Sequence, residues 1–131
     1  MHEDDAMPSG ELTIRVVAMP ADTNPAGDIF GGWLMSQMDL AASTTAALCA
    51  GGRCATVAID RVVFHRPVSV GDEVSIYTHI TKKGRTSMTI AVEAWRRVRR
   101  ASQRQKVTEG HFVFVALDES GRPRPVDTPC P

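Results

Sequence analysis

The spacing of apolar residues in the first half of the chain predicts one long helix. From residue 33 onward, apolar side chains recur at intervals of three and four residues, so at about 100° per residue they share one broad face. The members of that face are Leu34, Met35, Met38, Ala41, Ala42, Leu48 and Cys49. The opposite side carries Ser36, Gln37, Ser43 and Thr44. Because the stretch contains no Lys, Arg or Glu, we expect a mostly buried helix, with the carboxylate of Asp39 at the edge of its polar side.

Strand patterns precede and follow this helix. A first strand is predicted over Leu12–Ala18, and Gly51–Gly52 is expected to end the helix. Alternating apolar and polar residues on both sides of Lys83–Gly84 indicate a hairpin of two half-buried strands. The four strands expected after the helix cover residues 55–64, 73–82, 88–95 and 107–117. One strand, one long helix and then four strands predict an α+β fold.

Composition limits the classes of protein to which the chain can belong. Its 131 residues suit a single domain, and 15 Lys and Arg balance 15 Asp and Glu, so no net charge points to nucleic acid. No apolar run reaches the roughly 18 residues of a membrane span. The N-terminus lacks the pattern of a signal peptide. Three cysteines, Cys49, Cys54 and Cys130, are expected to be reduced thiols in a cytoplasmic protein, and the scattered histidines give no support for a metal site.

The chain is expected to form one domain with a tail at each end. It contains no internal repeat and no linker. The expected organisation is a flexible N-terminal tail over residues 1–10, a single domain over residues 11–118 and a Pro-rich C-terminal tail over residues 119–131.

The chemistry is expected between Asn24 and Asp39, where a glycine-rich turn leads into the helix. Glycines let a ligand approach the main chain closely, and the free N–H groups of a helix start bind negative charge. The helix start near Gly31 and Gly32 is therefore expected to polarise the carbonyl group of a bound ligand. Asp39 either fixes the helix through hydrogen bonds or handles a proton or a water molecule, and its residue type alone leaves both roles open. Asn24 is similarly either a turn residue or a participant in catalysis. Asp28 is expected to cap the helix.

Several ordered motifs resemble the YciA-type acyl-CoA thioesterases of the hotdog-fold superfamily. They occupy residues 19–24, 27–33, 35–39, 64–72, 82–87 and 112–116, so the resemblance covers about residues 11 to 125. It implies a curved antiparallel sheet wrapped around the central helix, and hydrolysis of acyl-CoA to a free fatty acid and CoA. It also implies that Asp39 acts as general base or nucleophile, and that Asn24 of the partner subunit positions water or substrate. Water activation and an anhydride intermediate both remain open.

Coenzyme A carries phosphates, so basic side chains are expected at the mouth of the site. The candidates, which otherwise form an ordinary solvated hairpin, are Arg66, Lys82, Lys83, Gly84, Arg85, Thr86 and Ser87. A second basic run, residues 96–104, is expected to be a solvated hairpin tip, with a phosphate contact as the second interpretation. No cofactor is expected beyond CoA as part of the substrate and product. The resemblance further implies a dimer, and a trimer of dimers as the full assembly.

Two other functions fit the same fold. A hotdog domain can bind acyl-CoA without cleaving it, although such a sensor has no need of the acid at Asp39. A hotdog hydratase typically pairs a histidine with an acid, but His65 lies in a strand of the fold and no histidine lies between Asn24 and Asp39. One departure from the family pattern is Ala41–Ala42, where related sequences more often carry two glycines. This difference leaves the preferred acyl chain length undetermined.

Overall fold

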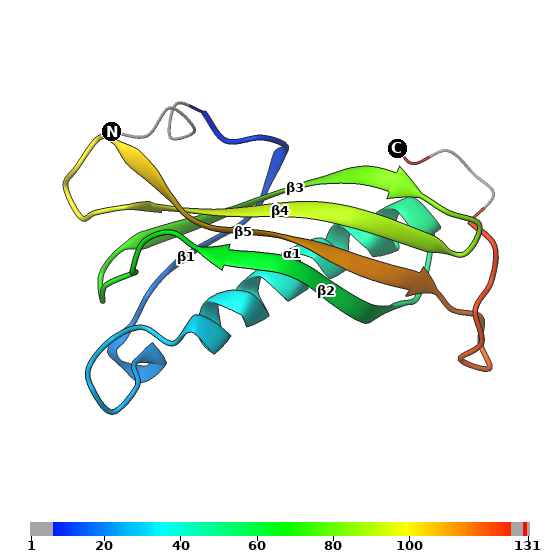
Figure 1. The fold of residues 1–131 in the computed structure, drawn as a ribbon, viewed down its shortest axis with the longest axis horizontal. Coiled ribbons are helices and arrows are strands. Elements are labelled where there is room, and N and C mark those ends of the chain that lie inside the picture. Colours follow the sequence, from blue (N-terminus) through cyan, green and yellow to red (C-terminus); the bar gives the residue numbers. More distant parts are fainter. Residues whose placement is uncertain (1–6, 127–129, 131) are drawn as a thin grey trace.

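Five antiparallel strands form one sheet, and a single long helix packs across one face of it (Figure 1). This computed structural model describes residues 7–126 and residue 130. The sheet order is β1-β3-β4-β5-β2, which leaves β1 and β2 at the edges. The elements are β1 (Glu11–Val17), the short 3₁₀ helix η2 (Pro20–Asp22), α1 (Gly31–Ala50), β2 (Cys54–Phe64), β3 (Glu73–Lys83), β4 (Ser87–Arg97) and β5 (Arg104–Ala116). The predicted α+β architecture is confirmed.

The helix α1 binds the sheet through small and medium apolar side chains. Met38, Ala42 and Ala46 are fully buried against the sheet residues Ile90 and Phe112. Ala41 and Ala42, the departure from the family pattern, both face this core. The helix ends where the sequence predicts, because Gly51 adopts a left-handed conformation with φ of 69°.

One side of α1 stays open, contrary to the expectation of a mostly buried helix. Leu48 was predicted on the buried face but is 67% exposed, and Leu40 is 56% exposed. The neighbouring edge strand β2 also exposes apolar residues, among them Val57 and Phe64 at 58% and 49%. The part of the chain that the structure describes leaves these side chains largely uncovered. A long, apolar edge strand is a surface that normally pairs with another strand.

The cysteines differ from the expectation of three reduced thiols. Cys49, in the last turn of α1, is joined by a disulfide to Cys130. Cys54 remains free, and burial raises the pKa of its thiol, an effect that the charge of Arg124 partly opposes. The pairing was not predictable because 81 positions separate the two residues in sequence.

Residues beyond the domain at both ends are only partly described. Residues 1–6, 127–129 and 131 lie outside the described residues, so the expected flexible N-terminal tail falls mostly outside them. Of the Pro-rich stretch, residues 119–126 are described, and Val126 is buried against the core. Among the described helices, none is long and apolar enough to cross a membrane.

Candidate active site

Asn24 holds together the loop that leads into α1. Its Oδ1 atom accepts hydrogen bonds from the backbone N–H groups of Ala26 and Asp28, each at 3.0 Å. These bonds are those of a turn-forming asparagine. They also fix the orientation of the side chain, so that Nδ2 faces away from the turn. Within the described part of the chain this amide has no partner, and it can therefore still donate to a ligand.

The helix starts at Gly31, and its first turn carries unused donors. The N–H groups of Gly31, Gly32 and Trp33 have no partner within residues 7–126 and 130. A side chain at position 31 would meet the ring of Phe64 at 3.4 Å, so glycine keeps this end of the helix open between the loop and β2. Asp28 does not cap the helix as expected, because its backbone is used by the Asn24 turn and α1 has no side-chain cap. The uncapped donors make this helix start a site for developing negative charge.

Asp39 lies on α1 at the edge of the open side, where a strand residue holds its carboxylate. Thr56 of β2 donates its hydroxyl to Asp39 Oδ1 at 2.7 Å. Asp39 itself is half-buried, and no basic side chain forms an ion pair with it among the described residues. One carboxylate oxygen is therefore fixed while the other remains available. The sequence analysis missed Thr56, although a hydroxyl residue within the otherwise apolar Ala55–Ala58 segment was a usable signal.

One chain does not bring the helix start and Asp39 together. Gly31 and Asp39 are eight residues apart on one straight helix, and at 1.5 Å per residue this corresponds to about 12 Å. A thioester carbonyl bound to the first-turn N–H groups is therefore too far from the Asp39 of the same chain for a water molecule to bridge. One chain therefore holds the open helix start and the carboxylate of Asp39 in two separate places.

An apolar hollow adjoins the helix start. It has a volume of about 310 Å³, and Gly31 and Arg66 lie on its wall. Its other lining residues are Ile29, Phe30, Leu34, Phe64, His65, Pro67 and Val68. His65 is turned to β5, where Nε2 lies 2.6 Å from Glu109 Oε2. This contact agrees with the assignment of His65 to the fold.

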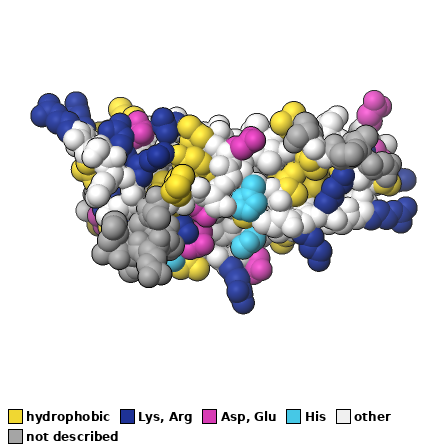
Figure 2. Space-filling model, turned by 90° about the horizontal axis from the view of Figure 1, so that it is seen from above, with side chains coloured by type: hydrophobic (Ala, Val, Ile, Leu, Met, Phe, Trp, Pro, Cys, Tyr) yellow, Lys and Arg dark blue, Asp and Glu magenta, His cyan; other side chains and the backbone are white. Residues whose placement is uncertain are grey.

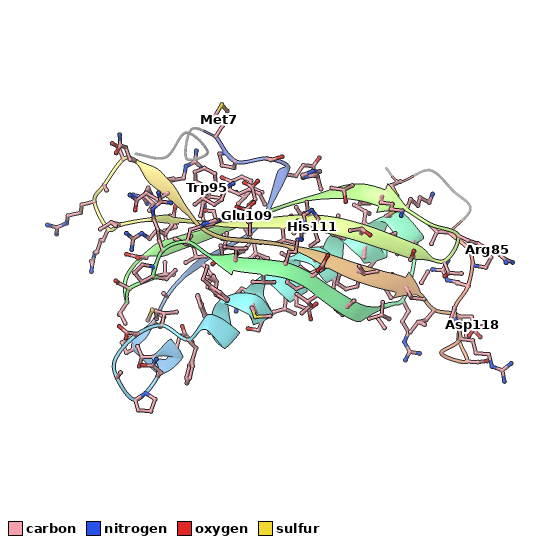
Figure 3. The ribbon with its side chains drawn as sticks, viewed as in Figure 1. Met7, Arg85, Trp95, Glu109, His111 and Asp118 are labelled. Atoms are coloured by element: carbon pink, nitrogen blue, oxygen red, sulfur yellow. A yellow bond between two sulfur atoms is a disulfide. The ribbon has the colours of Figure 1, made fainter. Side chains whose placement is uncertain are left out.

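The residues proposed to bind CoA occupy opposite ends of the molecule. Arg66 lies near the start of α1 and donates to the backbone oxygen of Lys106. The segment Lys82–Ser87 forms the β3–β4 turn beyond the other end of α1, where Figure 3 labels Arg85. A 20-residue helix is about 30 Å long, so the two regions of one chain are too far apart to form a single pocket for CoA. Lys and Arg side chains accordingly gather at both ends in Figure 2.

The β3–β4 turn is held by its backbone. Gly84 N donates to Ser87 O at 2.8 Å, and a side chain at position 84 would clash with Ser87 Oγ at 2.6 Å. The carbonyl oxygens of Arg85 and Thr86 accept from Val126 and Ala116. The side chain of Arg85 is exposed. The turn therefore has a fixed backbone and presents its basic side chain to solvent.

The second basic run is more structural than the expected solvated tip. Arg97 binds both carboxylate oxygens of Glu73, at 3.3 and 3.1 Å, and Arg96 binds Gln105 and the backbone of Pro67. The hydrogen bond from Arg97 holds the pKa of Glu73 below its usual value, and the same contact raises the pKa of Arg97. In this run, residues 98–100 and residues 102–104 are exposed, whereas Arg96, Arg97 and Ala101 are partly buried.

Comparison with known proteins places the chain in a family. The model of the thioesterase superfamily matches residues 26–102, which include the helix and its flanking turns. The chain belongs to the thioesterase superfamily, in its YciA-type branch. It is 49% identical over 127 residues to the acyl-CoA thioester hydrolase YciA of Salmonella typhimurium, covering 93% of this chain and 94% of that protein.

Solved structures of other members of the thioesterase superfamily share the fold. A hexameric thioesterase from Yersinia pestis is 48% identical with a TM-score of 0.90, covering 93% of this chain and 99% of that chain. A hexameric hotdog-fold thioesterase of Campylobacter jejuni is 38% identical with a TM-score of 0.83, covering 88% and 90%. Both are hexamers, which agrees with the uncovered side of α1 and β2.

Proposed function

We propose that the chain is an acyl-CoA thioesterase that hydrolyses acyl-CoA to a free fatty acid and CoA in a site shared by two copies. The observation that carries this proposal is the carboxylate of Asp39, held by Thr56 on the uncovered side of α1. Relatives named acyl-CoA thioester hydrolases support the reaction class. Asn24 and the helix start supply the remaining groups that the reaction needs.

The reaction needs a base and donors for the carbonyl oxygen. Water attacks the thioester carbon, Asp39 accepts a proton from that water, and the oxygen becomes negatively charged. The N–H groups of Gly31 and Gly32 stabilise this oxyanion, and the Nδ2 amide of Asn24 orients the water or the substrate. The intermediate then expels the CoA thiolate. Direct attack by Asp39 to form an anhydride uses the same groups.

Two copies paired along β2 close the 12 Å gap. If the antiparallel pair is centred near Asp60, Thr56 of one copy lies opposite Phe64 of the other. Thr56 binds Asp39, and Phe64 lies against Gly31, so the carboxylate of one copy meets the helix start of the other. The same pairing covers the exposed apolar residues of β2. Asn24 precedes that helix start in the chain, so it would join the site from the second copy too.

The antiparallel arrangement also gathers the CoA-binding residues. It places the β3–β4 turn of one copy at the end of the dimer where α1 of the other begins. Lys82, Lys83 and Arg85 of one copy and Arg66 of the other would then face the same bound CoA phosphates. We propose the dimer as the catalytic unit and, because the solved relatives are hexamers, a trimer of such dimers as the assembly.

Complementation between two inactive variants tests both the activity and the sharing of the site. Thiol release from a panel of acyl-CoA substrates should fall at least about 100-fold in Asn24→Ala and in Asp39→Ala, with both variants still assembled. Co-expression of the two should restore about a quarter of the wild-type activity, because a mixed dimer contains one site with both residues intact. Arg99→Ala, at the exposed hairpin tip, is the matched control.

Two results would contradict the proposal. Assembled wild-type protein that binds acyl-CoA without releasing thiol would favour the non-catalytic binding module. Inactive but assembled single variants whose mixture shows no recovery would exclude a site shared between Asn24 and Asp39.

A further inference from the structure

The C-terminal segment is attached to three parts of the domain at one end of the molecule. Arg124 donates from Nη2 to the backbone oxygen of Ala50 at 2.9 Å, which satisfies a carbonyl at the end of α1. Its backbone N–H donates to Ala116 O, at the end of β5. Val126 is buried, and its N–H donates to Arg85 O at 2.8 Å. Figure 1 shows this segment, in red, running past the end of α1 and the β3–β4 turn.

The disulfide lies just beyond these contacts. Cys130 follows Val126 by four positions and is bonded to Cys49, which is only 3% exposed in the last turn of α1. Both cysteines line a hollow of about 440 Å³ between β1, β3 and α1. Cys130 is only partly buried, so a small reagent can reach the sulfur pair through this hollow. The third cysteine, Cys54, lies elsewhere, in β2, and is free.

We propose that Cys49 and Cys130 form a reversible thiol–disulfide site that fastens the C-terminal segment to α1 and to the β3–β4 turn. The oxidant is a low-molecular-weight disulfide, RSSR. The thiolate of Cys130, the more accessible residue, attacks one sulfur of RSSR to form a mixed disulfide and releases RS⁻. The thiolate of Cys49 then attacks the sulfur of Cys130 and releases the second RS⁻. The two protons lost by the cysteines leave as two RSH, and excess thiol reverses the exchange.

Oxidation then acts on the β3–β4 turn through Val126. With the disulfide closed, the end of the segment cannot leave α1, so the hydrogen bond from Val126 to Arg85 is maintained. The disulfide also closes a loop spanning 81 positions, which restricts the unfolded chain. The oxidised protein should therefore be more stable and hold the turn more firmly. The effect on substrate binding rests on the proposed function, whereas the redox site itself does not.

Peptide mapping identifies the bonded cysteines without ambiguity. Trypsin places Cys49 in peptide 16–53, Cys54 in peptide 54–61 and Cys130 in peptide 107–131, because Arg122 and Arg124 precede prolines. Full-length protein is equilibrated with mixtures of reduced and oxidised glutathione and then alkylated. We expect a linked 16–53/107–131 pair whose amount rises with the oxidised fraction and disappears in excess thiol.

The same samples test the physical consequence. The oxidised protein should melt on the order of 10 °C above the reduced protein. Amide exchange at Val126 should be slower in the oxidised protein, and the KM for acyl-CoA about two- to tenfold lower, the range expected for one hydrogen bond. Cys130→Ser should abolish every redox-dependent difference, and Cys54→Ser should retain them all.

The proposal fails if no linked pair forms, if Cys54 is the residue that links, or if linked and reduced proteins match in melting temperature and Val126 exchange. An unchanged KM would overturn the coupling to the turn. Linkage, melting and exchange do not depend on catalysis, so an inactive protein that still shows them would contradict the proposed function and not the redox site.

Discussion

The hydrogen bond from Thr56 to Asp39 gives a graded test of the proposed catalytic carboxylate. In Thr56→Val the side chain keeps its shape but loses the hydroxyl that lies 2.7 Å from Asp39 Oδ1. A hydrogen bond to a charged group contributes about 1.5–3 kcal/mol, and because Thr56 is exposed in one chain we take the lower end. Since about 1.4 kcal/mol corresponds to a factor of ten, kcat should fall about tenfold.

The assay measures thiol release at saturating acyl-CoA, together with KM and melting temperature. Because Thr56 contacts Asp39 rather than CoA, KM should change little. Thr56→Ser keeps a hydroxyl and should recover most of the lost kcat. Thr81→Val is the matched control, since Thr81 is an exposed strand threonine whose hydroxyl, within the described residues, donates only to the backbone oxygen of Thr89. It should leave kcat unchanged.

Two results would refute this reasoning. A Thr56→Val enzyme with wild-type kcat would show that the hydrogen bond does not support the reacting form of Asp39. A Thr56→Ser enzyme as slow as Thr56→Val would show that the loss arises from packing of the strand and not from the hydroxyl.

Two further predictions concern charged residues away from Asp39. Arg85→Ala should raise KM for acyl-CoA about tenfold with kcat nearly unchanged, as expected when uniform binding is lost. If activity falls equally on acyl-CoA and on a short thioester that lacks the nucleotide, Arg85 supports the fold and does not bind CoA. The hydrogen bond from Arg97 lowers the pKa of Glu73 in the folded state. The ionised Glu73 therefore stabilises the fold at pH values above its unfolded pKa, and this stabilisation is lost as the pH falls through its folded pKa. Glu73→Gln should therefore lower the melting temperature at pH 7, by no more than about 3 °C for a partly exposed pair, and the difference should vanish at acidic pH. A difference that persists at acidic pH would exclude the ion pair as its cause.

Local sequence signals were sufficient for most of the fold. The helix ends before Gly51 because this glycine adopts a left-handed conformation, and such a signal requires no knowledge of distant residues. The turn between β3 and β4 follows from Gly84 in the same way. The motifs shared with the thioesterase family then identified Asn24 and Asp39 as candidates.

The features that sequence reasoning missed all depend on contacts between distant segments. Thr56 meets Asp39 across 17 positions, and its partner could be recognised only after β2 was placed beside α1. Cys49 and Cys130 were taken as free thiols because an odd number of cysteines gives no pairing. Leu48 was assigned to the buried face from its helical position alone, but the chain's own sheet covers only part of the helix circumference.

The rigidity of α1 connects assembly with catalysis. Gly31 and Asp39 are eight residues apart on one rigid helix, so their separation of about 12 Å is fixed. A change of side-chain conformation within one chain therefore cannot complete the proposed site. The uncovered apolar surface of β2 lies beside both Asp39 and Gly31, through Thr56 and Phe64. Pairing of that strand would therefore bury the apolar edge and bring the carboxylate of each copy to the helix start of the other in the same step. If the site is shared as proposed, we expect the monomer to lack activity for the same physical reason that it exposes β2.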